Sequence, residues 1–303
     1  MSFAIQGVAT QLGETRIDIR ENEKFLPVIE KTGIRFVFET SGTAIDLASG
    51  ALDQLMSEHP DALSGPSALI CVSQSPEYFL PSMSCQLQEK CQLPTQLLAF
   101  DLGQGCSGFV QALIVGTSLL ANFKNIVIVT TDTYRSKLRK DDRATAAVFS
   151  DGASATWISS GGPLEIIAES HFTDGSGKKF LFQKVHEEQS IGQLSMSGAD
   201  VLLFTQRIVP VEVENLMKAT GKNSVEIGNW YLHQASKLVL DRLEAKIQPA
   251  VPFHRNIHEV GNLVSSSIPF LLARDISKLN TGLTVMSGFG VGLSASSVLI
   301  SSR

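Results

Sequence analysis

The chain has 303 residues, of which 43% are hydrophobic and 18% are charged, and its net charge is −5 at pH 7. This composition is typical of a globular protein with a substantial core, and the chain shows no low-complexity run. The acidic balance argues against nucleic-acid binding, which needs a basic face. The first ten residues, MSFAIQGVAT, hold neither a basic segment nor a long apolar run, so we expect a cytoplasmic protein.

The cysteines argue against a metal site and against a disulfide framework. None of them belongs to a CxxC pair, and none lies beside a histidine at metal-ligand spacing. We therefore expect reduced thiols at Cys71, Cys85, Cys91 and Cys106.

The middle of the first half predicts a βαβ unit. Residues 97–100 and 125–132 (NIVIVTTD) are apolar runs typical of buried strands, and a glycine-rich turn opens the uncharged run 102–123 between them. This run is long enough to be considered as a membrane span, but its glutamines, asparagine and glycines favour a turn and a buried helix. We therefore expect no membrane segment and a parallel sheet covered by helices.

The same order of elements returns near the C-terminus. Residues 258–276 are predicted to form a turn and a helix, and residues 283–301 two strands. The repetition indicates a duplicated α/β unit whose halves meet at a shared cleft. Segment 161–180 is rich in glycine and polar residues, which is typical of a connection. We therefore divide the chain into an N-terminal half of residues 1–163 and a C-terminal half of residues 164–303.

Cys106 lies in the glycine-rich turn DLGQGCSGF, residues 101–109, which leads directly into the predicted helix. At a helix N-terminus the unpaired backbone N–H groups and the helix dipole stabilise a thiolate, so we expect a lowered pKa and a nucleophilic cysteine. Glycines around it permit a sharp turn and close approach to a substrate or to another segment.

His233 and Asn262 are the candidate partners of this thiol. His233 follows a predicted strand in NWYLHQAS, and the ends of parallel strands are where α/β sheets bind ligands. Asn262 lies in GNLVSSS, in the turn before the last predicted helix. Each has a structural alternative: the histidine as a core residue, and the asparagine as a helix N-cap.

A cysteine, a histidine and an asparagine also form the catalytic trio of papain-like proteases. Their cysteine lies near the mature N-terminus in a CGSCW-type segment, whereas Cys106 follows a hundred residues and precedes Ser107, Gly108 and Phe109. The protease interpretation therefore fits poorly.

The chain resembles the β-ketoacyl-acyl-carrier-protein synthase III enzymes of the thiolase superfamily over nearly its whole length. Each matching motif is weak alone, but together they follow the family's order. They are KTGIR (31–35), LPSMSCQLQ (80–88), DLGQGCSGF (101–109), DDRATAAVFSDGASA (141–155), SMSGADV (195–201), LHQAS (232–236), GNLVSSSIP (261–269) and GFGVGL (288–293).

The resemblance implies a thiolase-like fold, in which two βαβαβαββ halves form a five-layered αβαβα sandwich. It implies that Cys106 takes an acyl group from a thioester, with an oxyanion hole made by the N–H groups of Cys106 and Val291. His233 and Asn262 would stabilise the enolate formed when a malonyl thioester loses CO2. No metal and no cofactor is implied.

The resemblance also implies substrate contacts. Met196 and Phe289 would bind substrate, and Leu80 would shape the acyl pocket across the interface of a homodimer. The chain departs from the family where coenzyme A is held: the tryptophan expected before residue 31 is missing, and Leu238 and Val260 replace an arginine and a histidine or aromatic residue.

These departures favour an acyl carrier protein as donor, with coenzyme A still possible. A basic segment is the predicted docking site for the acidic carrier; it holds Arg135, Lys137, Arg139, Lys140 and Arg143.

Two other functions remain open. An acyltransferase on this scaffold would pass the acyl group from Cys106 to a hydroxyl, amine or thiol without forming a carbon–carbon bond. A non-catalytic subunit is the third alternative, and it is disfavoured because it has little need of cysteine, histidine and asparagine together.

Overall fold

The computed structural model describes residues 1–138, 143–184 and 193–303. The N-terminal half contains β1 (Ser2–Leu12), α2 (Ala44–Glu58), β4 (Ser67–Val72), α3 (Met83–Lys90), β5 (Leu98–Leu102), α4 (Gly108–Leu119), β6 (Asn125–Asp132) and β7 (Gly152–Ser160). The C-terminal half contains β8 (Leu164–Thr173), α6 (Gly198–Thr220), β11 (Ile227–Leu232), α7 (Lys237–Ile247), α9 (Ser267–Asp275), β12 (Leu283–Gly290) and β13 (Ser294–Ser302).

Shorter elements lie around this frame. They are β2 (Thr15–Asp18), α1 (Leu26–Thr32), β3 (Phe36–Glu39), the 3-10 turn η3 (Arg135–Lys137), α5 (Arg143–Ala146), β9 (Leu181–Phe182), β10 (Ser195–Met196), α8 (Ile257–Val260) and the 3-10 turn η6 (Val264–Ser266). The remaining 3-10 turns are η1 (Ile19–Glu21), η2 (Glu23–Phe25), η4 (Gly175–Lys179), η5 (Ser224–Glu226) and η7 (Ile276–Asn280).

The strand order shows the duplication. In the N-terminal half the strands run β1-β7-β6-β4-β5, and in the C-terminal half they run β8-β13-β12-β11. In each half the first strand (β1 or β8) therefore pairs with the last one (β7 or β13). The parallel strands lie on the far side of the last strand. β1 and β8 pair over two positions, Ser2 with Glu165 and Phe3 with Leu164, so hydrogen bonds link the two halves into one nine-stranded sheet.

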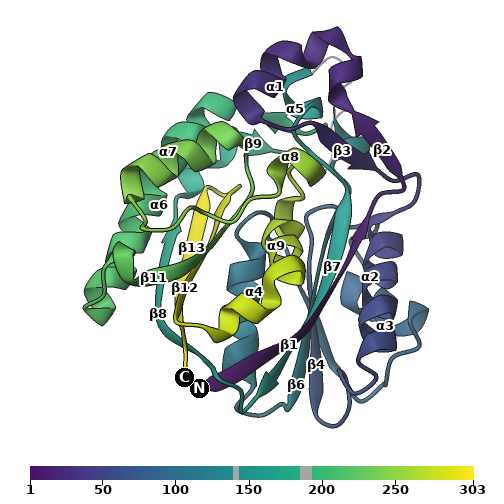
Figure 1. Cartoon of the computed structure of the whole chain (residues 1–303). Coiled ribbons are helices and arrows are strands. Elements are labelled where there is room, and N and C mark those ends of the chain that lie inside the picture. The colour runs from purple at the N-terminus through teal and green to yellow at the C-terminus, as the bar shows by residue number, and fades with distance from the viewer. Residues whose placement is uncertain (139–142, 185–192) are drawn as a thin grey trace.

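The helices form three layers with the two half-sheets between them. Figure 1 shows α4 and α9 in the centre, α2 and α3 outside the N-terminal strands, and α6 and α7 outside the C-terminal strands. The central layer is apolar: Phe109 and Leu113 of α4 and Ile268 and Leu271 of α9 belong to one buried cluster. The predicted five-layered αβαβα arrangement is confirmed.

The central strands are apolar because both of their faces are covered. Every residue of β4 and β6 is buried, as expected for parallel strands between helical layers.

The outer helix α2 begins with a capping box, in which the side chains of Thr43 and Asp46 each accept a hydrogen bond from the other's backbone N–H. No described helix has both the length and the hydropathy of a membrane-spanning segment.

One sequence prediction of local structure is wrong. Segment 161–180, expected to be a connection, contains β8, because its alternation of polar and apolar residues suits a strand that pairs with β13. The helix expected within residues 102–123 is present as α4, although it begins only at Gly108.

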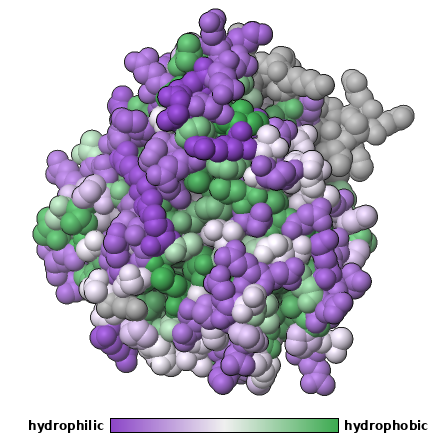
Figure 2. Space-filling model, turned by 45° about the vertical axis from the view of Figure 1, so that its right-hand side comes forward, coloured by the Kyte–Doolittle hydropathy of each residue, from purple (hydrophilic) through white to green (hydrophobic). Residues whose placement is uncertain are grey.

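The surface is mixed in character. On the face in Figure 2, hydrophilic side chains cover the top of the molecule, over α1 and the small β2–β3 sheet, while apolar side chains are exposed in the middle. Among the most exposed apolar side chains of the described residues are Tyr78, Phe79 and Leu80, which lie in the loop before α3.

Candidate active site

Cys106 lies in the loop between β5 and α4, two residues before the helix begins at Gly108. Its backbone packs against β12 of the other half. A Cβ at Gly288 would lie 2.7 Å from the Cys106 carbonyl oxygen and 2.8 Å from the Ser107 Cα. Glycine is therefore required at this crossing, where the two halves of the duplicated fold meet.

The sulfur of Cys106 is buried and lies within reach of two backbone donors. The N–H groups of Cys106 and Val291 both form hydrogen bonds with it and lower its pKa. Burial and the nearby Asp132 carboxylate have the larger effect and raise the pKa to about 12. The prediction of a lowered pKa is therefore wrong, because burial of the thiol outweighs the donors that stabilise its anion.

His233 follows β11, and its N–H donates to the carbonyl of Ser287 at 2.9 Å. Its ring meets the Phe289 ring edge-on, with centroids 5.5 Å apart. Burial lowers the pKa of His233 to about 3, and a hydrogen bond with the Val264 backbone opposes this shift. The ring is therefore neutral, and its Nδ1 has no hydrogen-bond partner among the described residues.

Asn262 lies between α8 and η6, and backbone bonds hold it on both sides. Its N–H donates to the Val148 carbonyl and its carbonyl accepts from the Ser150 N–H, both at 2.9 Å. Its Oδ1 accepts from the Val264 N–H at 2.9 Å, a local bond of the kind that an N-cap makes. Its Nδ2 group is the hydrogen-bond donor of the side chain.

One cavity of about 380 Å³ brings the predicted trio together. Met196 and Phe289, for which the sequence predicts substrate contacts, also lie in its wall. Its lining comprises Cys106, His233 and Asn262 with Pro27, Val28, Lys31, Thr32, Val148, Phe149, Leu181, Met196, Gly198, Val201, Leu202, Thr205, Ala235, Ser236, Val239, Phe289 and Gly290.

A second hollow of about 460 Å³ shares Leu181 with this cavity. Val291, Tyr134, Tyr78 and Phe79 contribute to its wall, so it lies beside the Cys106 loop. Leu80 does not line either space in the single chain: its side chain is 84% exposed at the tip of the loop.

Family models match both halves of the chain. The model for 3-oxoacyl-[acyl-carrier-protein] synthase III matches residues 100–175, and the model for the C-terminal part of the same enzyme matches residues 217–302. The chain belongs to this family. The membership confirms the predicted resemblance, and it makes the chain a condensing enzyme of the β-ketoacyl-acyl-carrier-protein synthase III type, which transfers acyl groups.

Known members of this family match the chain over nearly its whole length. A β-ketoacyl-[acyl-carrier-protein] synthase III of Streptococcus pyogenes is 29% identical over 90% of this chain and 89% of its own length. The crystal structure of a 3-oxoacyl-(acyl-carrier protein) synthase of Burkholderia xenovorans superposes with a TM-score of 0.91 at 27% identity, covering 100% of this chain and 94% of the other. A Pseudomonas aeruginosa synthase III, at 24% identity and a TM-score of 0.90 over 100% of this chain and 99% of its own, shares the fold.

The basic segment predicted to dock a carrier protein is only partly described. Arg135 turns inward: it pairs with Glu39 at 3.3 Å and donates to the carbonyls of Ala146 and Phe149. It therefore anchors the chain and is not free for docking, which corrects that part of the prediction. Lys137 lines the second hollow. Arg139 and Lys140 lie outside the described residues, as does the side chain of Arg143.

Sequence reasoning missed Asp132, a buried carboxyl at the end of β6. It accepts from the Ser265 hydroxyl at 2.5 Å and from the Gln74 N–H at 2.9 Å, so it ties the segment after Asn262 to the N-terminal half. Burial raises its pKa to about 7, although these hydrogen bonds lower it. The available signal was a charged residue at the end of the apolar run NIVIVTTD.

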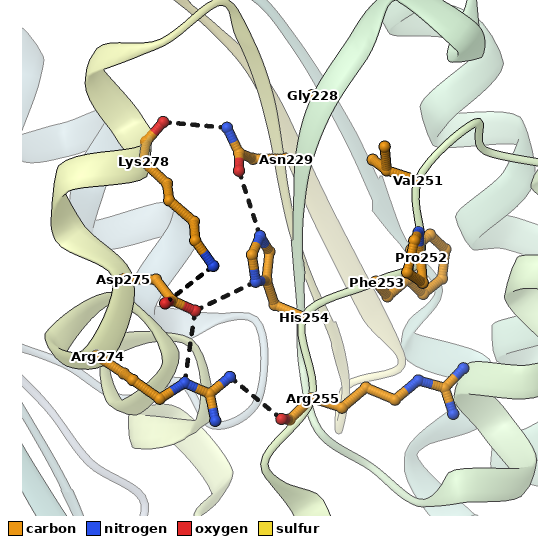
Figure 3. A pocket seen from close by; sticks show the side chains of 10 residues that line it. All are labelled: Gly228, Asn229, Val251, Pro252, Phe253, His254, Arg255, Arg274, Asp275 and Lys278. Carbon is orange, nitrogen blue, oxygen red and sulfur yellow. Dashed lines mark hydrogen bonds and ion pairs between the residues drawn. The ribbon is translucent and has the colours of Figure 1, made fainter.

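Another hollow, of about 530 Å³, lies at the start of β11, whereas His233 follows the end of that strand (Figure 3). In its wall, Asp275 pairs with His254 at 3.2 Å, with Arg274 at 3.4 Å and with Lys278 at 3.0 Å. The guanidinium of Arg255 points away from these groups. Asp275 thus links three basic side chains into one cluster, which joins the end of α9 to β11 and contains no nucleophile.

Proposed function

We propose that this chain loads an acyl group from a thioester onto Cys106 and condenses it with a malonyl thioester that loses CO2. One observation carries the proposal: Cys106, His233 and Asn262 line a single cavity, and two backbone N–H groups converge on the sulfur. The assignment of roles to these residues is part of the proposal.

In the loading step the Cys106 sulfur attacks the carbonyl carbon of the donor thioester. The new S–C bond forms, the donor's C–S bond breaks, and the thiol proton passes to the leaving thiol. The N–H groups of Cys106 and Val291 hold the negative oxygen of the tetrahedral intermediate. Because the resting thiol is protonated, the proton must leave as the sulfur attacks.

In the condensation step a malonyl thioester binds with its carbonyl oxygen toward His233 and Asn262. In the tautomer whose single N–H faces the substrate, neutral His233 donates a hydrogen bond, as does the Nδ2 of Asn262, and both stabilise the enolate formed as CO2 leaves. The enolate carbon attacks the acyl carbonyl, the bond to Cys106 breaks, and the departing thiolate takes up a proton from solvent. Since a positive imidazolium is not needed, the lowered pKa of His233 is compatible with this role.

An acyl carrier protein is the proposed donor, and coenzyme A is the alternative. From α1 the cavity receives Pro27, Val28, Lys31 and Thr32, none of which offers an aromatic face to an adenine ring. Lys31 is exposed at the opening, where a positive charge favours an acidic carrier surface or the phosphate of its prosthetic arm.

We further propose that the enzyme is a homodimer. Tyr78, Phe79 and Leu80 form a continuous exposed apolar segment beside the second hollow, and such a segment favours burial against a partner. In a dimer, Leu80 of one copy would reach the acyl pocket of the other. Leu80→Asp should then lower the dimer fraction measured by sedimentation.

Intact mass spectrometry tests the reaction. The wild-type chain is exposed to acyl-carrier-protein and acyl-coenzyme A thioesters, then to malonyl carrier protein, and released CO2 is measured. We expect an acyl adduct that Cys106→Ser abolishes. His233→Ala and Asn262→Ala should still acylate but lose decarboxylation by about a hundredfold, the size expected for an oxyanion donor.

His258→Ala is the matched control, because this histidine is exposed and outside the cavity. It should behave as wild type. An acyl adduct that is passed to an amine, hydroxyl or thiol without CO2 release would favour the simple acyltransferase and contradict condensation.

A further inference from the structure

A chain of hydrogen bonds joins the two backbone segments that carry the N–H groups at the Cys106 sulfur. The Ser107 and Ser294 hydroxyl oxygens lie 2.9 Å apart, and the Ser294 hydroxyl donates to the Val291 carbonyl at 2.8 Å. The amide nitrogen of Gln111, one turn into α4, lies 3.4 Å from the Ser107 oxygen. Both serines are buried.

Chemistry sets the direction of this chain. The Val291 carbonyl can only accept, so it receives the single proton of the Ser294 hydroxyl. Ser107 must therefore donate to Ser294, and the Gln111 amide, which can only donate, fills an acceptor position on Ser107. The same amide also donates to the Ser296 hydroxyl at 3.1 Å, so the Gln111 side chain, with which the chain of hydrogen bonds begins, is itself held in place.

We propose that Ser107 and Ser294 are positioning residues that clamp the oxyanion hole. Ser107 follows Cys106 directly, and Ser294 holds the carbonyl of Val291. Their bond therefore sets the distance between the two N–H groups that face the reacting oxygen. The inference rests on the proposed function only in using these N–H groups as an oxyanion hole.

The clamp matters because the second donor, the N–H group of Val291, lies in a glycine-rich turn. Val291 lies between Gly290 and Gly292, and Gly292 has a φ of 139°, a conformation that side chains other than glycine rarely adopt. The two serines are 187 positions apart in the chain. The Ser107–Ser294 bond ties these distant segments by their side chains, and a displacement of about 1 Å in either N–H group can cost a large factor in rate.

The test compares two reactions of the same sulfur. Para-nitrophenyl acetate acylates a thiol: the S–C bond forms, the bond to p-nitrophenolate breaks, the thiol proton passes to solvent, and a negative oxygen develops on the way. Iodoacetamide alkylates it by displacing iodide from a saturated carbon, and no oxyanion forms. Both rates are measured at Cys106 by peptide mass spectrometry at one pH.

We expect Ser107→Ala and Ser294→Ala each to slow acylation about tenfold while alkylation stays within about twofold. The double variant should be little slower than the singles, because each breaks the same chain. Ser294→Thr keeps the hydroxyl and should restore acylation. Ser297→Ala, which removes another buried serine pair of 2.8 Å on the same strand, is the matched control and should leave acylation unchanged.

Acylation at the wild-type rate in both alanine variants would overturn the clamp. So would an equal fall in alkylation, which would mean a general disturbance of the thiol, or a wild-type Cys106 that the ester does not acylate. The proposed function fails separately, if the wild-type chain accepts this ester but never releases CO2 from a malonyl thioester.

Discussion

Gly290 faces Cys106 so closely that a Cβ at Gly290 would lie 2.8 Å from the Cys106 Cβ and 3.0 Å from its sulfur. The last residue of β12, in the C-terminal half, thus forms one wall of the space around a nucleophile that belongs to the N-terminal half. The absence of a side chain there leaves room for the sulfur to carry an acyl group.

Gly290→Ala should therefore slow acylation of Cys106 by about a hundredfold or more, because the added methyl group displaces the sulfur or blocks the carbonyl. Gly103→Ala is the control in the same loop as Cys106, since a Cβ there meets nothing within 4 Å. Single-turnover acylation followed by mass spectrometry measures both. Equal rates for the two variants would contradict the close packing.

The four cysteines should react with an alkylating agent at different rates, and Cys106 should not be the fastest, although the sequence predicts a lowered pKa for it. Burial raises the pKa of Cys106 and of Cys91 to about 12, and that of Cys71 well above its ordinary value, whereas Cys85 is exposed. We expect iodoacetamide to modify Cys85 first at pH 7. The rate at Cys106 should rise about tenfold per pH unit between pH 7 and 10, as its thiolate fraction grows. A plateau below pH 9 would contradict this.

Asp132→Asn should accelerate alkylation of Cys106 at pH 9 by about three- to tenfold, because the Asp132 charge is one cause of the raised thiol pKa. The pKa of Asp132 itself is about 7, so the carboxyl is protonated at low pH. The difference between variant and wild type should therefore vanish near pH 5. A constant ratio across this range would show that the charge is not the cause.

The same variant should reveal a pH-dependent term in stability. Folding raises the pKa of Asp132 from 3.8 to about 7, so the folded state binds the extra proton between these values. This contribution to stability is complete below pH 4 and is lost as the pH rises through 7. The free energy of unfolding of Asp132→Asn, relative to wild type, should rise by about 1.4 kcal/mol per pH unit between pH 5 and 7.

Denaturant unfolding across this range measures the slope. Asp174→Asn is a suitable control: a hydrogen-bonded serine lowers the pKa of that exposed carboxyl, so its titration lies below the range. It should show no slope between pH 5 and 7. A flat difference for Asp132→Asn as well would mean that its carboxyl does not titrate in this window.

Lys31→Glu should weaken loading from an acyl carrier protein more than loading from acyl-coenzyme A. The lysine is exposed at the cavity opening, where its charge would attract the acidic carrier, and salt should screen this contact. We expect about a tenfold lower rate at low salt and a smaller difference at about 0.5 M. Lys218→Glu, on the distant part of α6, should have no effect. Salt-independent rates from both donors would rule out electrostatic docking.

The sequence by itself determined the organisation of the chain and its nucleophile. The repeated order of strand, turn and helix predicted the duplicated halves, and the chemistry of Cys106, His233 and Asn262 in their motifs predicted the trio that lines the cavity. These features are readable because periodicity and turn residues are local properties of the chain. β8 was missed because the glycines that flank it on both sides and its many polar residues favoured a connection.

Only the tertiary structure decided the protonation state of the thiol, the inward course of Arg135, and the parts played by Asp132 and by Ser107 with Ser294. A helix N-terminus predicts a low cysteine pKa, but segments far away in the chain bury Cys106 and place a carboxylate near it, and their effect is larger. Arg135 has charge enough for docking, yet Glu39 and two carbonyls hold it inside. Desolvation and hydrogen bonding depend on which groups lie close together in space. The spacing of residues along the sequence therefore does not predict their effect on a pKa or on the course of a side chain.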